Sequence, residues 1–118
     1  MNRIEISVLD PQAALDTFAE TWRDAEAGRS PTPTLAFGSL HDLFETITER
    51  RLALMRQVAA MDRANVSRLA KASDKDPATV QGDVERMLDL GLLVHDEQGD
   101  LRAPYDEIVI HAEIRKAA

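Results

Sequence analysis

The expected fold depends on residues 65–103, which read NVSRLAKASDKDPATVQGDVERMLDLGLLVHDEQGDLRA. Apolar residues recur there at three- and four-residue steps, which predicts two successive helices, each with one inward face. Asn65 and Asp76 stand where N-caps are needed, and the proline after Asp76 suits the first helical position. Residues 72–75, Ala-Ser-Asp-Lys, predict a tight turn between the two helices.

A β-hairpin is predicted directly after the second helix, which Gly91 closes. Residues 92–94 indicate a strand, residues 97–100 (Glu-Gln-Gly-Asp) indicate its turn, and residues 101–103 indicate the returning strand. A short helix, a tight turn, a second helix and a hairpin follow one another in this way in the winged helix-turn-helix class of DNA-binding domains. The sequence therefore predicts this fold for the middle of the chain.

Two more helices are expected before Asn65, one capped by Ser39 and one capped by Thr48. In front of them, the two prolines of residues 29–34 (RSPTPT) block a helix and an interior strand, which predicts a linker. Residues 1–28 precede this linker, with an alternating apolar pattern typical of a half-buried strand and then a helical pattern. We interpret them as a separate strand-helix arm.

The expected fold class is mainly α with a small β component. Alternating apolar residues from Tyr105 to Ile114 indicate a closing strand after the hairpin. The expected divisions are the arm at 1–28, the linker at 29–36, the winged helix-turn-helix domain at 37–104, and a C-terminal strand and tail at 105–118.

Composition excludes several classes of protein. The 118 residues include no cysteine, which excludes a disulfide framework, a thiolate zinc site and a cysteine nucleophile. The scattered positions of the three histidines disfavour a metal site, and no glycine-rich phosphate loop is present. No secretory leader and no run of ~20 apolar residues can be found. We therefore expect a soluble cytoplasmic protein that has no cofactor and no membrane contact and is not an enzyme.

The net charge of −7 argues against nucleic-acid binding, but the charge is unevenly distributed. Residues 48–86 carry eight basic and six acidic side chains and are the positive segment of the chain. Residues 1–47 have a net charge of −5 and residues 87–118 one of −4. The positive segment includes most of the predicted helix-turn-helix.

DNA contacts are expected from the second helix of the pair and from basic residues around the first. Gln81 can form paired hydrogen bonds to adenine, and Thr79 can contact a phosphate or a thymine methyl group. Basic residues near the first helix would contact phosphates, which positions a protein on DNA without reading its sequence. The expected DNA-binding residues are Arg63, Arg68, Lys71, Lys75, Ala78, Thr79, Gln81, Gly82, Arg86 and Arg102.

Several motifs also resemble those of a known family. They are Phe37-x-Ser39, Leu43-Phe44-x-x-Ile47-Thr48-x-x-Arg51, Leu69-Ala70, Asp83-Val84-x-x-Met87-x-x-Leu90-Gly91-Leu92-Leu93 and Pro104-Tyr105-Asp106-x-Ile108. Over about residues 35–110 the chain is similar to predicted transcriptional regulators with MarR/ArsR-type winged helices, which are often antitoxin-like. The resemblance implies a DNA-binding regulator. Its narrower form implies an antitoxin that neutralises a small toxin and represses its own operon.

Apolar residues outside the predicted winged domain indicate a second interface. Leu15, Phe18 and Trp22 lie on one face of the arm helix, while Ile108 and Ile110 lie in the closing strand. We expect them to form a homodimer or partner contact, which would place two recognition helices about one helical turn of DNA apart. In the alternative interpretation, the three arm residues only pack the arm onto its own domain.

Other interpretations compete with DNA binding. The acidic hairpin turn at residues 96–100 and Gly82 within a helix favour a winged-helix module for protein–protein contact that has no DNA-binding activity. An ordinary solvated surface is the alternative interpretation of the basic residues. Asp83 is predicted to pair with Arg50 or Arg51 inside the domain and not to contact DNA.

Overall fold

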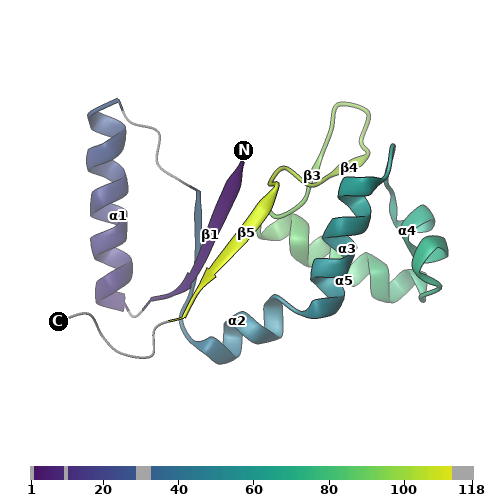
Figure 1. Ribbon diagram of the computed structural model, residues 1–118, viewed down its shortest axis with the longest axis horizontal. Coiled ribbons are helices and arrows are strands. Elements are labelled where there is room, and N and C mark those ends of the chain that lie inside the picture. The colour runs from purple at the N-terminus through teal and green to yellow at the C-terminus, as the bar shows by residue number, and fades with distance from the viewer. Residues whose placement is uncertain (1, 10, 29–32, 113–118) are drawn as a thin grey trace. The chain divides into compact units, whose positions relative to one another are not determined.

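The computed structural model describes the chain except residues 1, 10, 29–32 and 113–118 (Figure 1). It consists of two compact units. Unit 1 comprises Met1–Thr46 and Asp106–Ala118, and unit 2 comprises Ile47–Tyr105. About half of the chain is helical and about one fifth lies in strands. Among the helices that the structure describes, none has both the length and the apolar character needed to cross a membrane.

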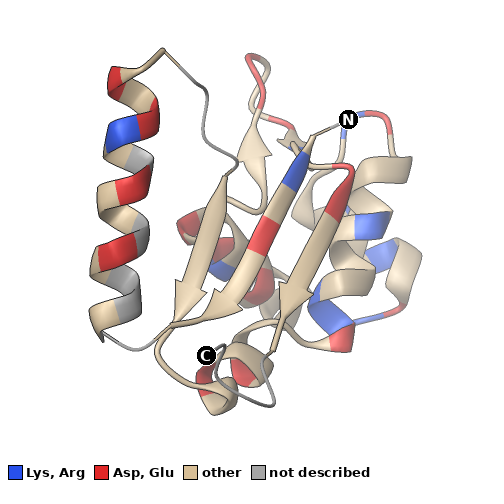
Figure 2. Ribbon diagram, turned by 60° about the vertical axis from the view of Figure 1, so that its left-hand side comes forward, with Lys and Arg blue, Asp and Glu red and all other residues tan. Residues whose placement is uncertain are grey.

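Unit 1 is built on a parallel sheet of three strands. β1 (Arg3–Val8) lies in the centre, between β2 (Thr34–Phe37) and β5 (Glu107–His111). All three arrows point in the same direction in Figure 2. Because parallel neighbours cannot be joined by a tight turn, a long connection is needed between β1 and β2. That connection includes the helix α1 (Pro11–Glu26).

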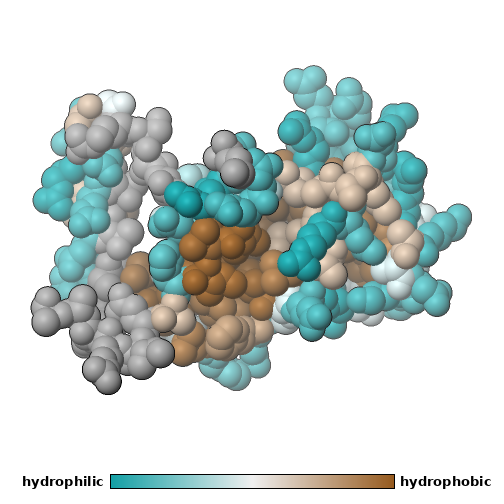
Figure 3. All heavy atoms as spheres, in the orientation of Figure 1, coloured by the Kyte–Doolittle hydropathy of each residue, from teal (hydrophilic) through white to brown (hydrophobic). Residues whose placement is uncertain are grey.

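The register of the strands gives the sheet one apolar face. Ile4 of β1 is paired with Ile108 of β5, and Ile6 lies between Leu35 of β2 and Ile110 of β5. Ile4 and Ile6 are buried, and Figure 3 shows hydrophobic residues gathered where β1 and β5 lie. Side chains alternate along a strand, so the residues between them belong to the other face. That face carries Arg3, Glu5, Ser7, Glu107 and His111.

The short helix α2 (Leu40–Thr46) follows β2 in unit 1. The backbone N–H of Asp42 donates to the Ser39 hydroxyl over 3.1 Å, which satisfies one free donor of the first turn. Leu43 is completely buried and anchors the helix in the core of this unit. The predicted capping role of Ser39 is therefore confirmed.

Unit 2 contains three consecutive helices and a β-hairpin. The helices are α3 (Glu49–Ala60), α4 (Val66–Ser73) and α5 (Pro77–Asp89), and the hairpin strands are β3 (Val94–His95) and β4 (Leu101–Arg102). The buried apolar side chains come from all of these elements except β3 and from the links between them. They include Leu54, Val58, Leu69, Val84, Met87, Leu93 and Leu101.

The helices of unit 2 begin at the N-caps that the sequence predicts. Thr48 accepts a hydrogen bond from the backbone N–H of Arg51, and Asn65 accepts one from that of Arg68. Asp76 caps α5 by accepting from the backbone N–H of Thr79 over 3.3 Å, directly before Pro77. Each cap satisfies a donor that would otherwise lack an intrahelical partner. These local predictions are confirmed.

The hairpin is joined to the rest of unit 2 by backbone contacts. Gly91 ends α5 in a left-handed conformation, with φ at +76°, which glycine adopts without steric cost. The Leu101 N–H donates to the carbonyl of Ala64 over 2.9 Å, so the link before α4 pairs with β4. Asp96 stabilises the hairpin turn by accepting from the N–H groups of Gln98 and Asp100.

The fold class expected from the sequence, a mainly α winged helix-turn-helix domain preceded by an arm, is wrong. The chain has an α/β fold in which β1 is the centre of a parallel sheet and not part of a separate arm. β2 begins in the segment expected to be a linker, residues 29–36, and ends at Phe37 just after it; residues 29–32 are outside the described part. The prolines there exclude an interior strand, but β2 is an edge strand, where a preceding proline is tolerated.

Candidate nucleic-acid interface

The two helices singled out by the sequence, α4 and α5, pack against each other and are separated by a turn of residues 74–76. Asp74 adopts a left-handed conformation, with φ at +52°, and Lys75 N–H donates to the carbonyl of Ala70 over 3.1 Å. These features end α4 sharply and let α5 start in a new direction. Leu69 and Ala70 of α4 are buried and anchor this helix in the apolar core of unit 2.

The amino-terminal half of α5 presents an uncharged surface. Val80, Asp83, Val84 and Met87 are its buried residues, which leaves the opposite side of the helix exposed. That side carries the expected contacts Ala78, Thr79, Gln81 and Gly82, all of them exposed. Gln81 Nε2 donates to Glu85 Oε1 over 2.9 Å, which orients the amide group and leaves its oxygen free to accept.

Two of the expected phosphate contacts are engaged within unit 2. Arg68 Nη1 donates to the backbone carbonyls of Asp62 and Arg63, at 3.0 and 3.2 Å. Arg63 Nε lies 3.5 Å from Asp100 Oδ2, which links the loop before α4 to the hairpin. Both arginines are exposed. Their guanidinium groups nevertheless contact the loop carbonyls and the hairpin, and these contacts are not evident from the spacing of residues in the sequence.

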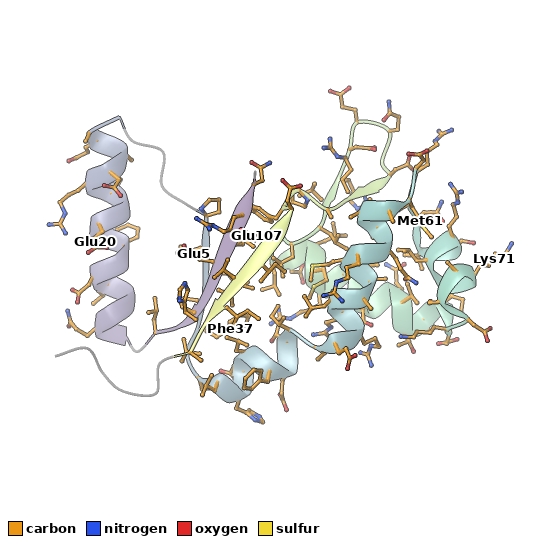
Figure 4. The ribbon with its side chains drawn as sticks, in the orientation of Figure 1. Glu5, Glu20, Phe37, Met61, Lys71 and Glu107 are labelled. Carbon is orange, nitrogen blue, oxygen red and sulfur yellow. The ribbon has the colours of Figure 1, made fainter. Side chains whose placement is uncertain are left out.

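The other four cations, Lys71, Lys75, Arg86 and Arg102, are exposed, and within the described part of the chain they form no ion pair. Lys71 extends away from α4 in Figure 4. Since Leu69 and Ala70 face inward, the exposed side of α4 carries Arg68 and Lys71. These cations are the residues most available to a polyanion.

Acidic residues limit the positive character of the whole chain. Unit 2 contains nine basic and ten acidic residues, whereas unit 1 contains five basic and eleven acidic residues. The corresponding net charges are −1 and −6, and Figure 2 shows acidic positions along α1. The hairpin turn also carries Asp96, Glu97 and Asp100. Any contact with phosphate therefore depends on a local cluster of cations within a weakly acidic unit.

Asp83 is held by two arginines of α3. Arg50 donates from Nε to Oδ2 over 2.7 Å and from Nη2 to Oδ1 over 2.9 Å, and Arg51 Nε donates to Oδ1 over 2.9 Å. The Arg50 hydrogen bonds are the main cause of a lowered Asp83 pKa, and Arg51 adds to the effect while burial opposes it. The same contact raises the pKa of Arg50. The prediction that Asp83 pairs within the domain is confirmed, with both candidate partners.

The residues expected at a dimer or partner interface lie in unit 1. Leu15, Phe18 and Trp22 of α1 are 64%, 67% and 59% exposed, and a shallow hollow of about 460 Å³ lies beside Phe18 and Trp22. Ile110 of β5 is 42% exposed, whereas Ile108 is half-buried. Among the described residues, no close packing of α1 on β5 is found, so the structure does not join the two groups into one surface. Among the described residues, no cluster of metal-ligating side chains occurs.

Comparison with known proteins assigns the chain to a protein family. The fold defines an α/β protein with a parallel sheet in one unit and three helices with a hairpin in the other. A model of the family HVO_A0114 matches residues 46–110, more than half of the chain, and the chain belongs to this family. No curated protein and no solved structure matches it. The family name states no activity, so the resemblance to MarR/ArsR-type regulators stays a prediction.

Proposed function

We propose that the chain binds double-stranded DNA as a transcriptional regulator, with the amino-terminal half of α5 in the major groove. The supporting observation is the exposed, uncharged side of α5 directly after a tight turn from α4, whose own exposed side is basic. A major groove about 12 Å wide admits one α-helix. α5 has 13 residues, enough to lie along several base pairs.

Base recognition would use the polar and small residues of α5. The Gln81 amide can both donate to and accept from the edge of adenine, while Thr79 can contact a thymine methyl group. Ala78 and Gly82 are exposed on the same side and add little bulk between the helix backbone and the bases. The acidic Glu85 lies one turn further along the helix, which favours contact through the first half alone.

Phosphate contacts would come from Lys71, Lys75, Arg86 and Arg102, which form no ion pair within the described part. Arg68 would contribute from the same side of α4 while it bonds to the loop carbonyls. Because unit 2 has a net charge of only −1, weak overall repulsion would be overcome by these local contacts at low salt. Binding is therefore expected to weaken steeply as salt rises.

The test is fluorescence anisotropy with a mixed-sequence DNA duplex, at about 50 and about 200 mM salt. The charge reversal Lys71→Glu should weaken binding roughly tenfold at the lower salt and reduce the salt slope by about one. Arg56→Glu is the matched control, because it makes the same charge change on the exposed side of α3, opposite the buried Leu54, Met55 and Val58. Its effect should be several-fold smaller.

Two results would count against the proposal. Absence of binding to any duplex at the lower salt would exclude DNA as the ligand. Equal losses from Lys71→Glu and Arg56→Glu would mean that net charge, and not the α4–α5 surface, determines the affinity. Selection of bound fragments from the host genome would then identify the operator of a protein that passes both tests.

A protein–protein interaction module is the second candidate function. The acidic hairpin turn and the net charge of −6 in unit 1 favour a basic protein partner over DNA. The antitoxin hypothesis is one form of this second function, because an antitoxin binds a toxin protein. A small basic toxin-like product encoded beside the gene would support it. Homodimer formation through α1 and β5 also stays a prediction, which a molar mass measured in solution by light scattering would test.

A further inference from the structure

The Arg50–Asp83–Arg51 cluster, which we call the α3–α5 clamp, joins the first turn of α3 to the middle of α5. Asp83 receives three hydrogen bonds between 2.7 and 2.9 Å, two from Arg50 and one from Arg51. Its side chain is 6% exposed, whereas those of Arg50 and Arg51 are 48% and 18% exposed. The carboxylate is thus held from two directions at a site that solvent barely reaches.

The clamp acts on a helix whose other inward contacts are apolar. Val80, Val84 and Met87 bury the inner side of α5, and apolar burial is non-directional. Such contacts bury one side of the helix, but they include no directional bond that sets its exact rotation about its axis. Paired arginine–carboxylate hydrogen bonds are directional, and they fix the position of Asp83 relative to α3. α3 and α5 approach each other less closely than α4 and α5 do, so these long side chains bridge the distance.

Asp83 is also adjacent in sequence to the residues expected to contact bases. Successive residues of a helix are 100° apart, so any rotation that moves Asp83 moves Gly82 and Gln81 with it. A rotation of that kind would redirect the Gln81 amide, which is held by Glu85 of the same helix and turns as one body with α5. The clamp therefore adds a directional restraint on the rotation of α5 about its axis to the apolar contacts that bury its inner side.

We infer that Asp83 is a positioning residue for DNA recognition, acting through Arg50 and Arg51 without touching DNA. This inference rests on the proposed function. It predicts an unusual direction for the change in DNA affinity when the Asp83 charge is removed. Removal of a carboxylate from a DNA-facing helix normally strengthens binding, since it removes repulsion with phosphate. Removal of the Asp83 charge should instead weaken binding, because α5 loses its orientation.

The experiment compares Asp83→Asn with Asp89→Asn in the full chain, using a selected DNA fragment and a mixed-sequence duplex. Asp89 is exposed on the same helix, and its replacement makes the same change in charge. Asp83→Asn should weaken binding to the selected fragment by about tenfold, the size of one lost base contact, with little change for the mixed duplex. Asp89→Asn should leave binding unchanged or tighten it. Equal behaviour of the two variants would overturn the inference.

A second pair of variants covers the case in which Asp83→Asn does not fold. Arg50→Gln keeps the Arg51 bond and should weaken specific binding more than Arg56→Gln, which removes the same charge from the other side of α3. Val58→Ala, a buried substitution in α3, reports the effect of lowered stability alone. If Val58→Ala, at a temperature where it is folded, weakens specific binding as much as Arg50→Gln, the positioning role is wrong.

Failure of the proposed function is distinguished by a measurement that needs no DNA. Residual dipolar couplings of backbone N–H and Cα–Hα bonds report the orientation of α5, including its rotation about its own axis, relative to α3 and α4 in the wild-type chain and in Asp83→Asn. A changed rotation or direction of α5 with α3 and α4 unaltered would support the clamp even if the wild-type chain binds no DNA. An identical rotation and direction in the two proteins would overturn the positioning role, whatever the chain binds.

Discussion

Unit 2 is stabilised mainly by contacts between residues close together in the sequence, whereas unit 1 is stabilised by contacts between residues far apart in the sequence. In unit 2, three consecutive helices begin at caps whose hydrogen bonds reach three residues along the chain, and α4 packs on α5 across a three-residue turn. In unit 1, the central strand β1 pairs with β2 and with β5, which lies at the opposite end of the chain. Unit 1 therefore depends on the ordering of distant segments, at a larger cost in chain entropy.

The structure of unit 2 thus follows largely from the pattern of neighbouring residues. The structure of unit 1 depends on which distant strands pair with one another. Unit 2 also has a directional polar link, the α3–α5 clamp, in addition to its apolar core. Unit 1 has an ion pair between the first residues of β1 and β5, with Arg3 Nη1 3.6 Å from Glu107 Oε1, but both side chains are about half exposed. Such exposed pairs contribute little to stability.

The largest expected effect concerns the centre of the sheet. Ile6→Ala should lower the stability of unit 1 by about 3 kcal/mol, because Ile6 is completely buried between β2 and β5. Hydrogen exchange measured residue by residue should show lost protection in β1 and β5 and retained protection in α5. Ser7→Ala, on the polar face, is the control and should change little. Equal loss of protection in both units would show that they unfold as one.

The next effect concerns acid and the α3–α5 clamp. The pKa of Asp83 is lowered in the folded chain, mainly by the Arg50 hydrogen bonds, so its charged form stabilises the fold. This contribution is complete above the ordinary pKa of 3.8 and is lost as pH falls through the lower folded value.

Asp83→Asn should lower stability by about 2 kcal/mol at neutral pH, less than a fully buried pair would because Arg50 is half exposed. The difference between the two proteins, measured by denaturant unfolding, should stay constant above about pH 5 and shrink below about pH 4. A difference that stays the same at every pH would contradict the assigned pKa direction.

The smallest effect separates two glycines of unit 2. Gly82 lies within α5, no atom would lie within 4 Å of an added Cβ, and its φ is not positive. Gly82→Ala should therefore stabilise unit 2 by about 0.5 to 1 kcal/mol, from helix propensity alone. Gly91→Ala has equal space but a φ of +76°, so it should destabilise by about 1 kcal/mol. Thermal melts of the two variants should move in opposite directions, and a shared direction would contradict this assignment.

The exposure of the candidate residues and the pairing of Asp83 were foreseeable from sequence, whereas contact with DNA stays a prediction. The expected DNA-binding residues are all exposed, and Asp83 could be assigned to Arg50 and Arg51 because a carboxylate on an inward helical position needs a cationic partner. The bonds of Arg68 to loop carbonyls and of Arg63 to Asp100 were not foreseeable. They join residues brought together by a left-handed turn at Arg63 and by the hairpin.

The sequence alone determined the caps, the turn between α4 and α5, the inward faces of α4 and α5, and the hairpin after Gly91. These features arise from interactions between residues a few positions apart, which composition and spacing record directly. Only the tertiary structure decided that β1, β2 and β5 form one parallel sheet and that the chain has an α/β fold. Parallel pairing joins backbone groups of distant segments, and backbone hydrogen bonds carry no signature in the side chains.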